Sequence, residues 1–589
     1  MSLPSTIRWD QSAEGVVTLT LDDPGQSANT MNAAYMASMH ATVARLEAER
    51  EGITGVIVAS AKKTFFAGGD LGELLAVTPE DGAEYAGRVE GAKADLRRLE
   101  ALGVPVVSVI AGAALGGGLE IALATHHRIV VDDPKVQLGL PEVTLGLLPG
   151  GGGLTRTVRL LGVHGALSHI LLDGPRFPPA AALEQGLVDE LVGSADELIP
   201  AALRFIADHP GSTQPWDRDG YVLPGGVPAG ADDVVDGLAI SDASREALVG
   251  GNYPAPAAIL AAAVEGARGT IDEALEIEGR HFMGLVTHQV AKNMIQSNFF
   301  DLQAVAGARG RPRDRARWTP GQIVIDEPGD AADDLAALLS GASIDVVVPV
   351  GPPAPSAPPE SVLAVTPSAL LPHPAARGEA TAVIGLRPAP GGLLEVVHDD
   401  HTPDEIVWRA LDLARAVRRT PILIGAGHGF LVERLEASLL READLLRTEG
   451  HTTHGILDAL RDVGYTAAAR DRIGARVQAR QVGDAPATLR SVPADDVRDR
   501  LLFAPALEAV RCRDEGVVTL DADANVASLR AIGFPGWTGG VLQFVEAFRP
   551  RGAAPGALGS RTAFLRRARS LATDYGPRFT PPSVLVKAG

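Results

Sequence analysis

Two carboxylates, Glu120 and Glu142, lie in glycine-rich and mostly apolar sequence. Glu120 directly follows three glycines, residues 116–118, and Glu142 precedes a four-glycine run, residues 150–153. Apolar surroundings disfavour the charged form of a carboxyl group, so its pKa rises and it can act as an acid or a base near neutral pH. Glu120 alone could equally be a chance residue on a surface helix, but the whole arrangement favours a catalytic site.

The glycines beside Glu120 predict a second chemical function. A helix is expected over Leu119–Ala124, so these glycines lie where backbone N–H groups have no partner within the helix. Glycine lets a ligand approach the backbone closely, and the helix dipole adds positive potential at this end. Such N–H groups suit an oxygen atom that gains negative charge during a reaction.

Short strands and helices must hold these residues in place. Alternating or β-branched runs predict strands, and apolar residues at helical spacing predict helices. We expect a strand at the edge of a hairpin over residues 14–22, further strands over 55–60, 104–110 and 128–131, and helices over 29–49 and 80–102. His126 and His127 follow an apolar helix without the spacing of a metal site, so we expect no metal ligands there.

The composition restricts the class of protein. With 589 residues the chain is expected to form about two to four domains. Its formal net charge of −20 argues against nucleic acid or an anionic membrane as the main partner. The single cysteine, Cys512, excludes an intrachain disulfide. The N-terminus lacks a signal-peptide pattern, and no run of about 18 apolar residues is present. We therefore expect a cytoplasmic protein without a membrane span.

The motifs around both carboxylates have an order and spacing that resemble the crotonase (enoyl-CoA hydratase/isomerase) superfamily. Five segments carry this resemblance: Phe65–Leu71, Gly116–Glu120, Leu140–Gly146, Pro149–Arg156 and Ala182–Asp189. The resemblance implies a spiral of stacked ββα units. Periodicity alone would not separate that fold from a doubly wound parallel sheet.

The resemblance also implies a role for each site residue. The N–H groups of Gly69 and Gly117 would hold the thioester oxygen of a trans-2-enoyl-CoA. Glu142 would donate a proton to Cα, Glu120 would orient the added water, and the N–H of Gly150 would also hold that water. Further substrate contacts are implied for Ala67, Gly68, Asp70, Leu71 and Gly116.

The second half of the chain is similar to the fused hydratase–dehydrogenase proteins of fatty-acid β-oxidation, the alpha subunits of the bacterial complex. One long helix is expected over residues 270–303, like the linking helix of those proteins. The segments that resemble a 3-hydroxyacyl-CoA dehydrogenase are residues 393–397, 402–422, 429–434 and 498–540.

The dehydrogenase chemistry is interrupted at several matching positions. After the strand expected over Gln322–Ile325, residues 326–330 have one glycine where a dinucleotide-binding turn has three. The family's catalytic histidine would fall near Ile384, and Glu433 stands where the family has an asparagine. Its partner glutamate matches Glu395, and an active-site serine weakly matches Ser368. We therefore expect no NAD cofactor and no hydride transfer.

The expected fold class is α/β. A crotonase-like ββα spiral would be followed by a truncated Rossmann-like remnant and by all-α lobes of dehydrogenase type. The expected boundaries are a crotonase core at 1–195, crotonase C-terminal helices and linking helix at 196–308, a linker at 309–321, the Rossmann-like remnant at 322–424, and helical lobes at 425–484 and 485–589.

The sequence thus predicts an enoyl-CoA hydratase that acts on acyl-CoA thioesters without a metal or other cofactor. Three alternatives stay open. One is an enoyl-CoA isomerase, for which a single carboxylate suffices. Another is a scaffold pseudoenzyme subunit that docks a thiolase through its helical lobes. The least favoured is a bifunctional hydratase and dehydrogenase.

Overall fold

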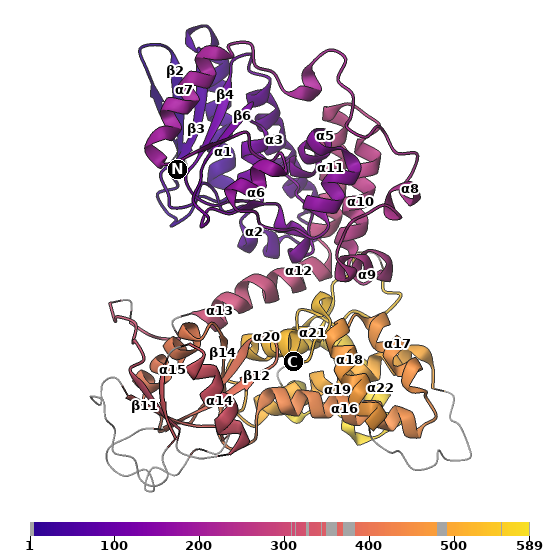
Figure 1. Ribbon diagram of the computed structural model, residues 1–589. Helices are drawn as coiled ribbons and strands as arrows, with labels where there is room; N and C mark the ends of the chain where they lie inside the picture. The colour runs from indigo at the N-terminus through magenta and orange to yellow at the C-terminus, as the bar shows by residue number, and fades with distance from the viewer. Residues whose placement is uncertain are drawn as a thin grey trace. The chain divides into compact units, whose positions relative to one another are not determined.

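The computed structural model describes residues 5–307, 309–312, 314–325, 329–342, 344–348, 362–368, 371, 383–479, 492–554 and 556–587. The chain divides into two compact units, Met1–Lys292 and Asn293–Gly589 (Figure 1). Residues 326–328, which belong to the interrupted dinucleotide turn, lie outside the described residues.

The first unit contains a six-stranded sheet of order β1-β2-β3-β4-β6-β8. The strands are β1 (Ile7–Gln11), β2 (Val16–Leu21), β3 (Gly55–Ser60), β4 (Val106–Ile110), β6 (His127–Val131) and β8 (Glu190–Val192), with β5 (Ala114–Leu115) and β7 (Leu138–Gly139) forming a separate pair. Strands β1 and β2 are antiparallel, and the other neighbours are parallel. The expected strands are confirmed, but β1 rather than β2 forms the edge.

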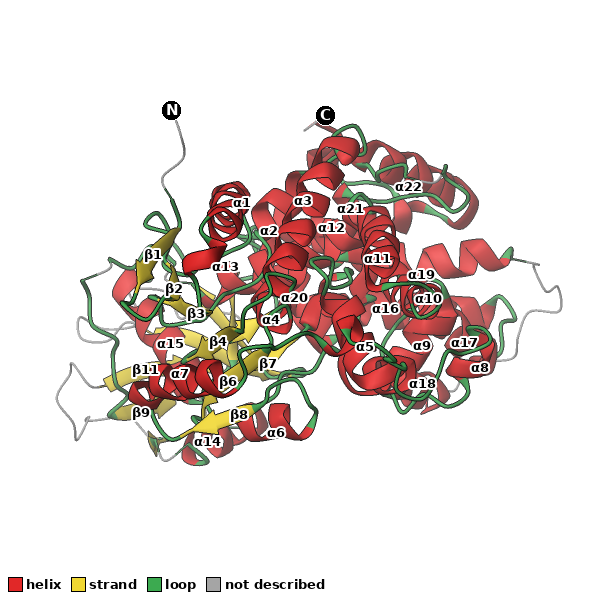
Figure 2. Ribbon diagram, turned by 90° about the horizontal axis from the view of Figure 1, so that it is seen from above, coloured by secondary structure: helices red, strands yellow, loops and turns green. Residues whose placement is uncertain are grey.

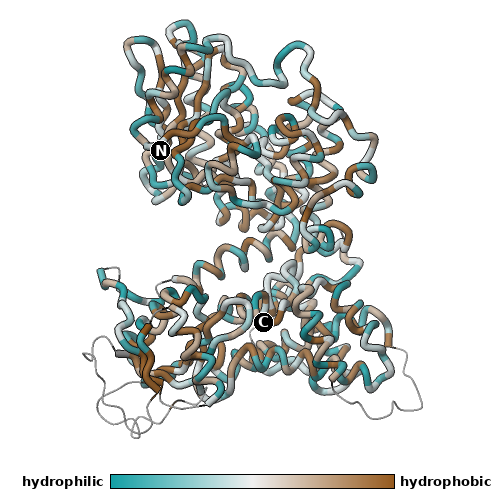
Figure 3. Tube along the Cα trace, in the orientation of Figure 1, coloured by the Kyte–Doolittle hydropathy of each residue, from teal (hydrophilic) through white to brown (hydrophobic). Residues whose placement is uncertain are grey.

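Helices of the first unit pack around this sheet. They are α1 (Ala33–Ala48), α2 (Leu71–Ala76), α3 (Gly82–Glu100), α4 (Gly117–Leu123), α5 (Gly153–Ala166), α6 (Pro179–Glu184), α7 (Leu198–Asp208), α8 (Asp232–Val235), α9 (Asp242–Gly250), α10 (Pro254–Gly266) and α11 (Ile271–Val286). Helix α7 buries Leu198, Ala202 and Ile206 at helical spacing, and they pack in one hydrophobic cluster with residues of β2, β3, β4 and β6. Figure 3 shows hydrophobic residues along the strands of both units.

The long helix expected over residues 270–303 is interrupted, so that prediction is wrong in detail. Helix α11 ends at Val286, and three shorter segments follow: α12 (Gln289–Ile295), the π-helical η6 (Gln296–Asp301) and α13 (Leu302–Ala306). The N–H of Val290 donates to Nδ1 of His288 at 3.1 Å. The His288 side chain therefore takes up a donor at the start of α12 that a continuous helix would have paired with a carbonyl.

The second unit begins with a mixed six-stranded sheet of order β10-β9-β11-β12-β13-β14. Its strands are β9 (Gln322–Ile325), β10 (Asp345–Val347), β11 (Val362–Thr366), β12 (Val383–Ala389), β13 (Leu393–His398) and β14 (Thr420–Gly425), with helices α14 (Asp330–Ser340) and α15 (Asp404–Ala416). Only the β12–β13 pair is antiparallel among these described strands. Side chains from α14 and α15 share one hydrophobic core with the strands.

The rest of the second unit is helical (Figure 2). Its helices are α16 (Leu431–Thr448), α17 (Thr453–Val463), α18 (Ala467–Ala479), α19 (Ala494–Asp514), α20 (Asp521–Ala531), α21 (Val541–Glu546), α22 (Arg561–Tyr575) and α23 (Ser583–Lys587). Cys512 on α19 is buried, as expected for a packed thiol. The expectation of an α/β protein with a second sheet and a helical C-terminal region is thus confirmed, whereas the finer domain boundaries stay predictions.

No single described helix is long and apolar enough to cross a membrane, although α9 and α10, bent by 87°, reach the length and hydropathy together. No group of three or more His, Cys, Asp or Glu side chains in the described ranges could hold a metal ion.

A buried ion pair in the second unit generates a stability prediction. Nε of Arg500 donates to Glu442 at 2.6 Å, and both side chains are almost fully buried. Glu442→Ala would leave Nε of this buried guanidinium without a partner, although Glu449 still pairs with Arg500 at 2.5 Å, so we expect the free energy of unfolding to fall by about 3 kcal/mol. Asp458→Ala, which breaks partly exposed pairs with His454 and Arg461, should change it by at most about 1 kcal/mol. Urea unfolding measures both, and equal effects would contradict the prediction.

Candidate active site

Glu120 is held by the glycine turn that precedes α5. It lies in the first turn of α4 and is 4% exposed. Its Oε1 accepts hydrogen bonds from the N–H groups of Gly151 at 2.8 Å and Gly153 at 2.9 Å. Both N–H groups donate to Oε1, so Oε2 accepts neither of these two hydrogen bonds. The turn therefore orients the carboxylate while leaving its second oxygen for a reacting group.

Glu142 lies beside Gly116, the residue just before α4. It lies in a 3₁₀ turn, Pro141–Leu145, and its Oε2 is buried without a hydrogen-bond partner among the described residues. A Cβ atom at Gly116 would lie 2.6 Å from Oε1 of Glu142, and Gly116 has a φ of +53°. Both the space and the backbone conformation therefore require glycine at this position.

Burial and the charge of a neighbouring glutamate raise the pKa of both carboxyl groups. Burial, followed by the charge of Glu278, raises the pKa of Glu120 to about 7, against the opposing effect of the Gly153 and Gly151 N–H groups. Burial, followed by the charge of Glu120, raises the pKa of Glu142 well above its usual range. The two groups titrate as a pair, which can hold one proton near neutral pH and exchange it with a bound molecule.

The two expected oxyanion donors lie on adjacent loops. Gly117 is the first residue of α4, where N–H groups have no partner within the helix. A Cβ atom on Gly117 would lie 3.4 Å from the Cα of Gly68. The carbonyl of Gly68 accepts from the N–H of Met31 at 2.8 Å, so the N–H of Gly69 in the same planar peptide points away from Met31. The loops of both expected donors are therefore side by side.

The other expected substrate contacts belong to the same loop, where some also have structural roles. Ala67 donates its N–H to the carbonyl of Asn29 at 2.8 Å. Asp70 is the N-cap of α2 and accepts from the N–H groups of Gly72 and Glu73. Leu71 is the first residue of that helix. Their contact with a substrate stays a prediction.

Helix α11 contributes two side chains that the sequence analysis did not assign to the site. Glu278 is buried and accepts hydrogen bonds from Gly152 and Thr155. A Cβ atom at Gly150 would lie 2.4 Å from the ring of Phe282, so this ring covers the glycine expected to hold water. The available signal was Glu278 itself, a carboxylate four residues before Phe282 and therefore on the same face of the predicted helix. The water contact of Gly150 stays a prediction.

The positions matched to a dehydrogenase lie on β12, β13, α16 and the segment after β11. Ile384 is fully buried in β12. Glu395 lies opposite Arg387 in the β12–β13 pair and accepts from the N–H of Val432 at 3.1 Å, and burial raises its pKa to about 7. Glu433 is paired with Arg387 at 2.7 Å. Ser368 donates its N–H to Thr366.

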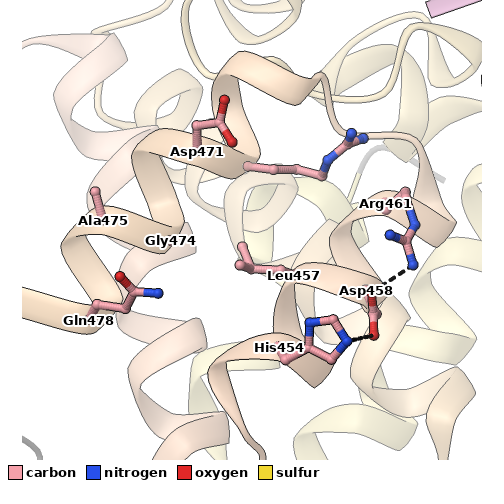
Figure 4. Close-up of a pocket in the computed structure, with 9 residues that line it drawn as sticks. His454, Leu457, Asp458, Arg461, Asp471, Gly474, Ala475 and Gln478 are labelled. Carbon is pink, nitrogen blue, oxygen red and sulfur yellow. Dashed lines mark hydrogen bonds and ion pairs between the residues drawn. The ribbon is translucent and has the colours of Figure 1, made fainter. Parts of the chain in front are cut away.

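A separate surface pocket of about 420 Å³ lies between α17 and α18 (Figure 4). Its charged side chains include His454 and Arg461, which both pair with Asp458. None of the residues that the sequence predicts for the site lines this pocket.

Comparisons with known proteins find relatives of the N-terminal region and of the whole chain. Residues 11–209 match the family model described as enoyl-CoA hydratase/isomerase. The fatty acid oxidation complex subunit alpha of Shewanella frigidimarina is 27% identical over 729 positions, covering 100% of this chain and 98% of the relative. The subunit of the same name from Shewanella loihica is 27% identical over 706 positions, covering 97% of each.

Solved structures with similarity to the chain cover smaller parts of it. DspI of Pseudomonas aeruginosa is 29% identical, with a TM-score of 0.31, and the match covers 34% of this chain and 74% of that one. An enoyl-CoA hydratase from Bacillus anthracis is 24% identical, with a TM-score of 0.32, and the match covers 50% of this chain and 96% of that one.

The raised pKa of Glu120 predicts a pH dependence of stability. Folding raises this pKa from 4.5 to about 7, so the native state binds the proton more tightly than the unfolded state between these values. The contribution to stability is complete below pH 4.5 and is lost as the pH rises through about 7. Glu120→Gln cannot ionise, so it removes this pH-dependent loss of stability. Its amide oxygen can still accept the N–H groups of Gly151 and Gly153. Relative to the variant, the wild type should therefore lose stability from pH 4.5 to 7, as measured by thermal unfolding. Parallel curves would contradict this.

Proposed function

We propose, on the premise that this chain has an N-terminal crotonase domain and is a distant full-length homologue of fatty acid oxidation complex alpha subunits, that it hydrates trans-2-enoyl-CoA thioesters. The proposal covers fatty-acid β-oxidation or a related acyl-CoA degradation. It rests on one observation above all: Glu120, on the first turn of α4, and Glu142, beside Gly116 just before that helix, lie close enough for the charge of Glu120 to raise the pKa of Glu142.

In the proposed reaction, ionised Glu120 orients a water molecule and accepts one of its protons. The water oxygen bonds to Cβ of the substrate, and the electrons of the double bond move through Cα to the thioester oxygen. The N–H groups of Gly69 and Gly117 stabilise the resulting enolate, and each such donor lowers a barrier by about 3–4 kcal/mol in comparable sites. Protonated Glu142 then gives its proton to Cα, and a return of the proton from Glu120 to Glu142 restores the pair.

The presence of both carboxylates favours hydration over isomerisation of the double bond. An isomerase needs one group to move a proton between two carbons, whereas water addition needs one group at the water and one at Cα. Glu120 is buried in the first turn of α4, and Glu142 lies beside Gly116 immediately before that helix, which fits this division of roles. Isomerisation is therefore the second candidate reaction.

The second unit is proposed to carry no hydride transfer and to bind no NAD. Ile384 lies in the hydrophobic core at the position expected for the base, and an alkyl group cannot accept a proton. Glu433, at the position where the family has an asparagine, forms an ion pair with Arg387 and has no side-chain amide. The alignment with one relative runs over 729 positions against 589 residues here, so that relative has segments without a counterpart in this chain.

A structural role is proposed for this unit instead. Its sheet and helices retain continuous hydrophobic cores. The alpha subunits that resemble this chain are named as subunits of a complex. We infer that the unit supports a hetero-oligomer in which a thiolase is the expected partner.

The first functional prediction concerns the two carboxylates. Glu120→Gln and Glu142→Gln should each lower kcat for crotonyl-CoA hydration by several orders of magnitude, and the double variant should lose little more, because residues that act as a unit are not additive. Loss of the enoyl-thioester absorbance measures the rate. Glu84→Gln, an exposed change on α3, is the control and should keep wild-type turnover. Near-wild-type activity of either active-site variant would refute the assignment.

A second prediction tests the cofactor. Titration calorimetry with NADH should show no binding at micromolar concentrations, and 3-hydroxyacyl-CoA with NAD should produce no NADH absorbance. Crotonyl-CoA hydration by the same sample provides the positive control for folded protein. Micromolar NADH binding, or NADH production coupled to hydration, would restore a bifunctional enzyme.

A further inference from the structure

Two carboxylates bind the glycine turn before α5, and successive N–H groups of the turn donate to one and then to the other. The N–H groups of Gly151 and Gly153 donate to Glu120, whereas that of Gly152 donates to Oε1 of Glu278 at 2.7 Å. Oε2 of Glu278 accepts from the N–H of Thr155 at 2.9 Å. These donors belong to the start of a helix, where no backbone carbonyl can satisfy them. Together, the two carboxylates thus accept the N–H groups of four residues at this helix start: Gly151, Gly152, Gly153 and Thr155.

The turn has no side chains with which to fix its own conformation. A Cβ atom at Gly152 would lie 1.9 Å from Nη1 of Arg156, and Gly152 has a φ of +102°. A Cβ atom at Gly151 or Gly153 would lie 2.7 or 2.8 Å from a carboxylate oxygen of Glu120. Glycine is the most flexible residue, so the turn depends on its hydrogen bonds for a single conformation.

Glu278 is fully buried and faces charged groups from several elements. Burial raises its pKa, while Lys93 on α3 and the N–H groups of Thr155 and Gly152 lower it. The other charged or titratable groups around it are Glu90 on α3, which pairs with Lys93, Glu120 on α4, Glu142 in the 3₁₀ turn and Arg156 on α5. The charge of Glu278 raises the pKa of both Glu120 and Glu142.

We propose that Glu278 is a positioning residue of the hydration site, which fixes the glycine turn that orients Glu120 and sets the charge around the catalytic pair. This inference rests on the proposed hydratase function. Phe282, one helical turn further along α11, packs against Gly150 of the same turn. Helix α11 therefore contacts the turn through both an acceptor and an apolar side chain.

Glu278→Gln is the informative variant, because the two glutamates use their oxygens differently. Glu120 accepts both N–H groups on one oxygen, so a glutamine there keeps both bonds. Glu278 uses one oxygen for each donor, so the amide of a glutamine must point its own N–H at one of them. The variant keeps the volume of the side chain but loses one acceptor and the negative charge.

We expect Glu278→Gln to lower kcat for crotonyl-CoA by about 10- to 100-fold, as small displacements of a catalytic group do, with a KM change below about twofold. Loss of the Glu278 charge lowers the pKa of Glu120, which must be ionised, and that of Glu142, which must be protonated. Both limbs of the kcat–pH profile should therefore move to lower pH. A purely structural role would lower kcat without moving either limb.

Glu276→Gln provides the matched control, since Glu276 is exposed two residues earlier on the same helix. It should leave kcat, KM and the pH profile unchanged. Glu278→Asp keeps the charge but shortens the reach, so it should lower kcat while leaving the limbs in place. Thermal unfolding and near-ultraviolet circular dichroism report whether each variant is folded.

The outcomes separate this inference from the function on which it rests. A wild-type protein without hydratase activity would overturn the proposed function. A second outcome would overturn the positioning role alone. In it the wild type is active, the kcat of Glu278→Gln stays within about twofold of the wild-type value, and the limbs of its pH profile move by less than about 0.2 pH units (about the precision of such profiles). If both Glu278 variants fail to fold, Glu278 serves stability and the positioning role is also overturned.

Discussion

The candidate site depends on the hydrogen bonds between Oε1 of Glu120 and the N–H groups of Gly151 and Gly153. A carboxylate removed from water needs compensating donors, and unpaired backbone N–H groups supply them here without adding a charge. Those groups are available because α5 begins at this turn. The rest of the first unit must therefore hold the start of α5 against the first turn of α4, which carries Glu120.

The same bonds explain why the pKa of Glu120 stops near neutrality. Burial and the nearby carboxylates favour the protonated form, whereas the two N–H donors and Arg156 favour the ionised form. Oε2 of Glu142 is buried without such donors, and burial followed by the charge of Glu120 raises the pKa of this group well above its usual range. The donors at the helix start therefore fit Glu120 to the role of base in the proposed reaction, and their absence at Oε2 fits Glu142 to the role of acid.

The local parts of this site could be predicted from the sequence, because neighbouring residues determine them. The glycines beside Glu120 and the β-branched run before them specify a strand, a turn and a helix start within a few residues. The break after Val286 was missed because the side chain of His288 ends the helical pattern without a proline or a glycine. The role of Glu278 was missed for another reason. Its partners are more than 100 positions away in sequence, and no local pattern reports such a contact.

This long-range contact also bears on which part of the chain makes a complete site. The family match ends at residue 209, yet Glu278 and Phe282 lie on α11, well after that point. Without α11, the N–H groups of Gly152 and Thr155 would lose their acceptors, and the face of Gly150 would lose its apolar cover. Water would then reach a turn that holds Glu120, and the pKa of that carboxyl group would fall toward its ordinary value as burial decreased. The smallest part of the chain that this geometry supports for the proposed reaction therefore extends through Val286, since α11 supplies both acceptors and apolar cover to the turn that holds Glu120.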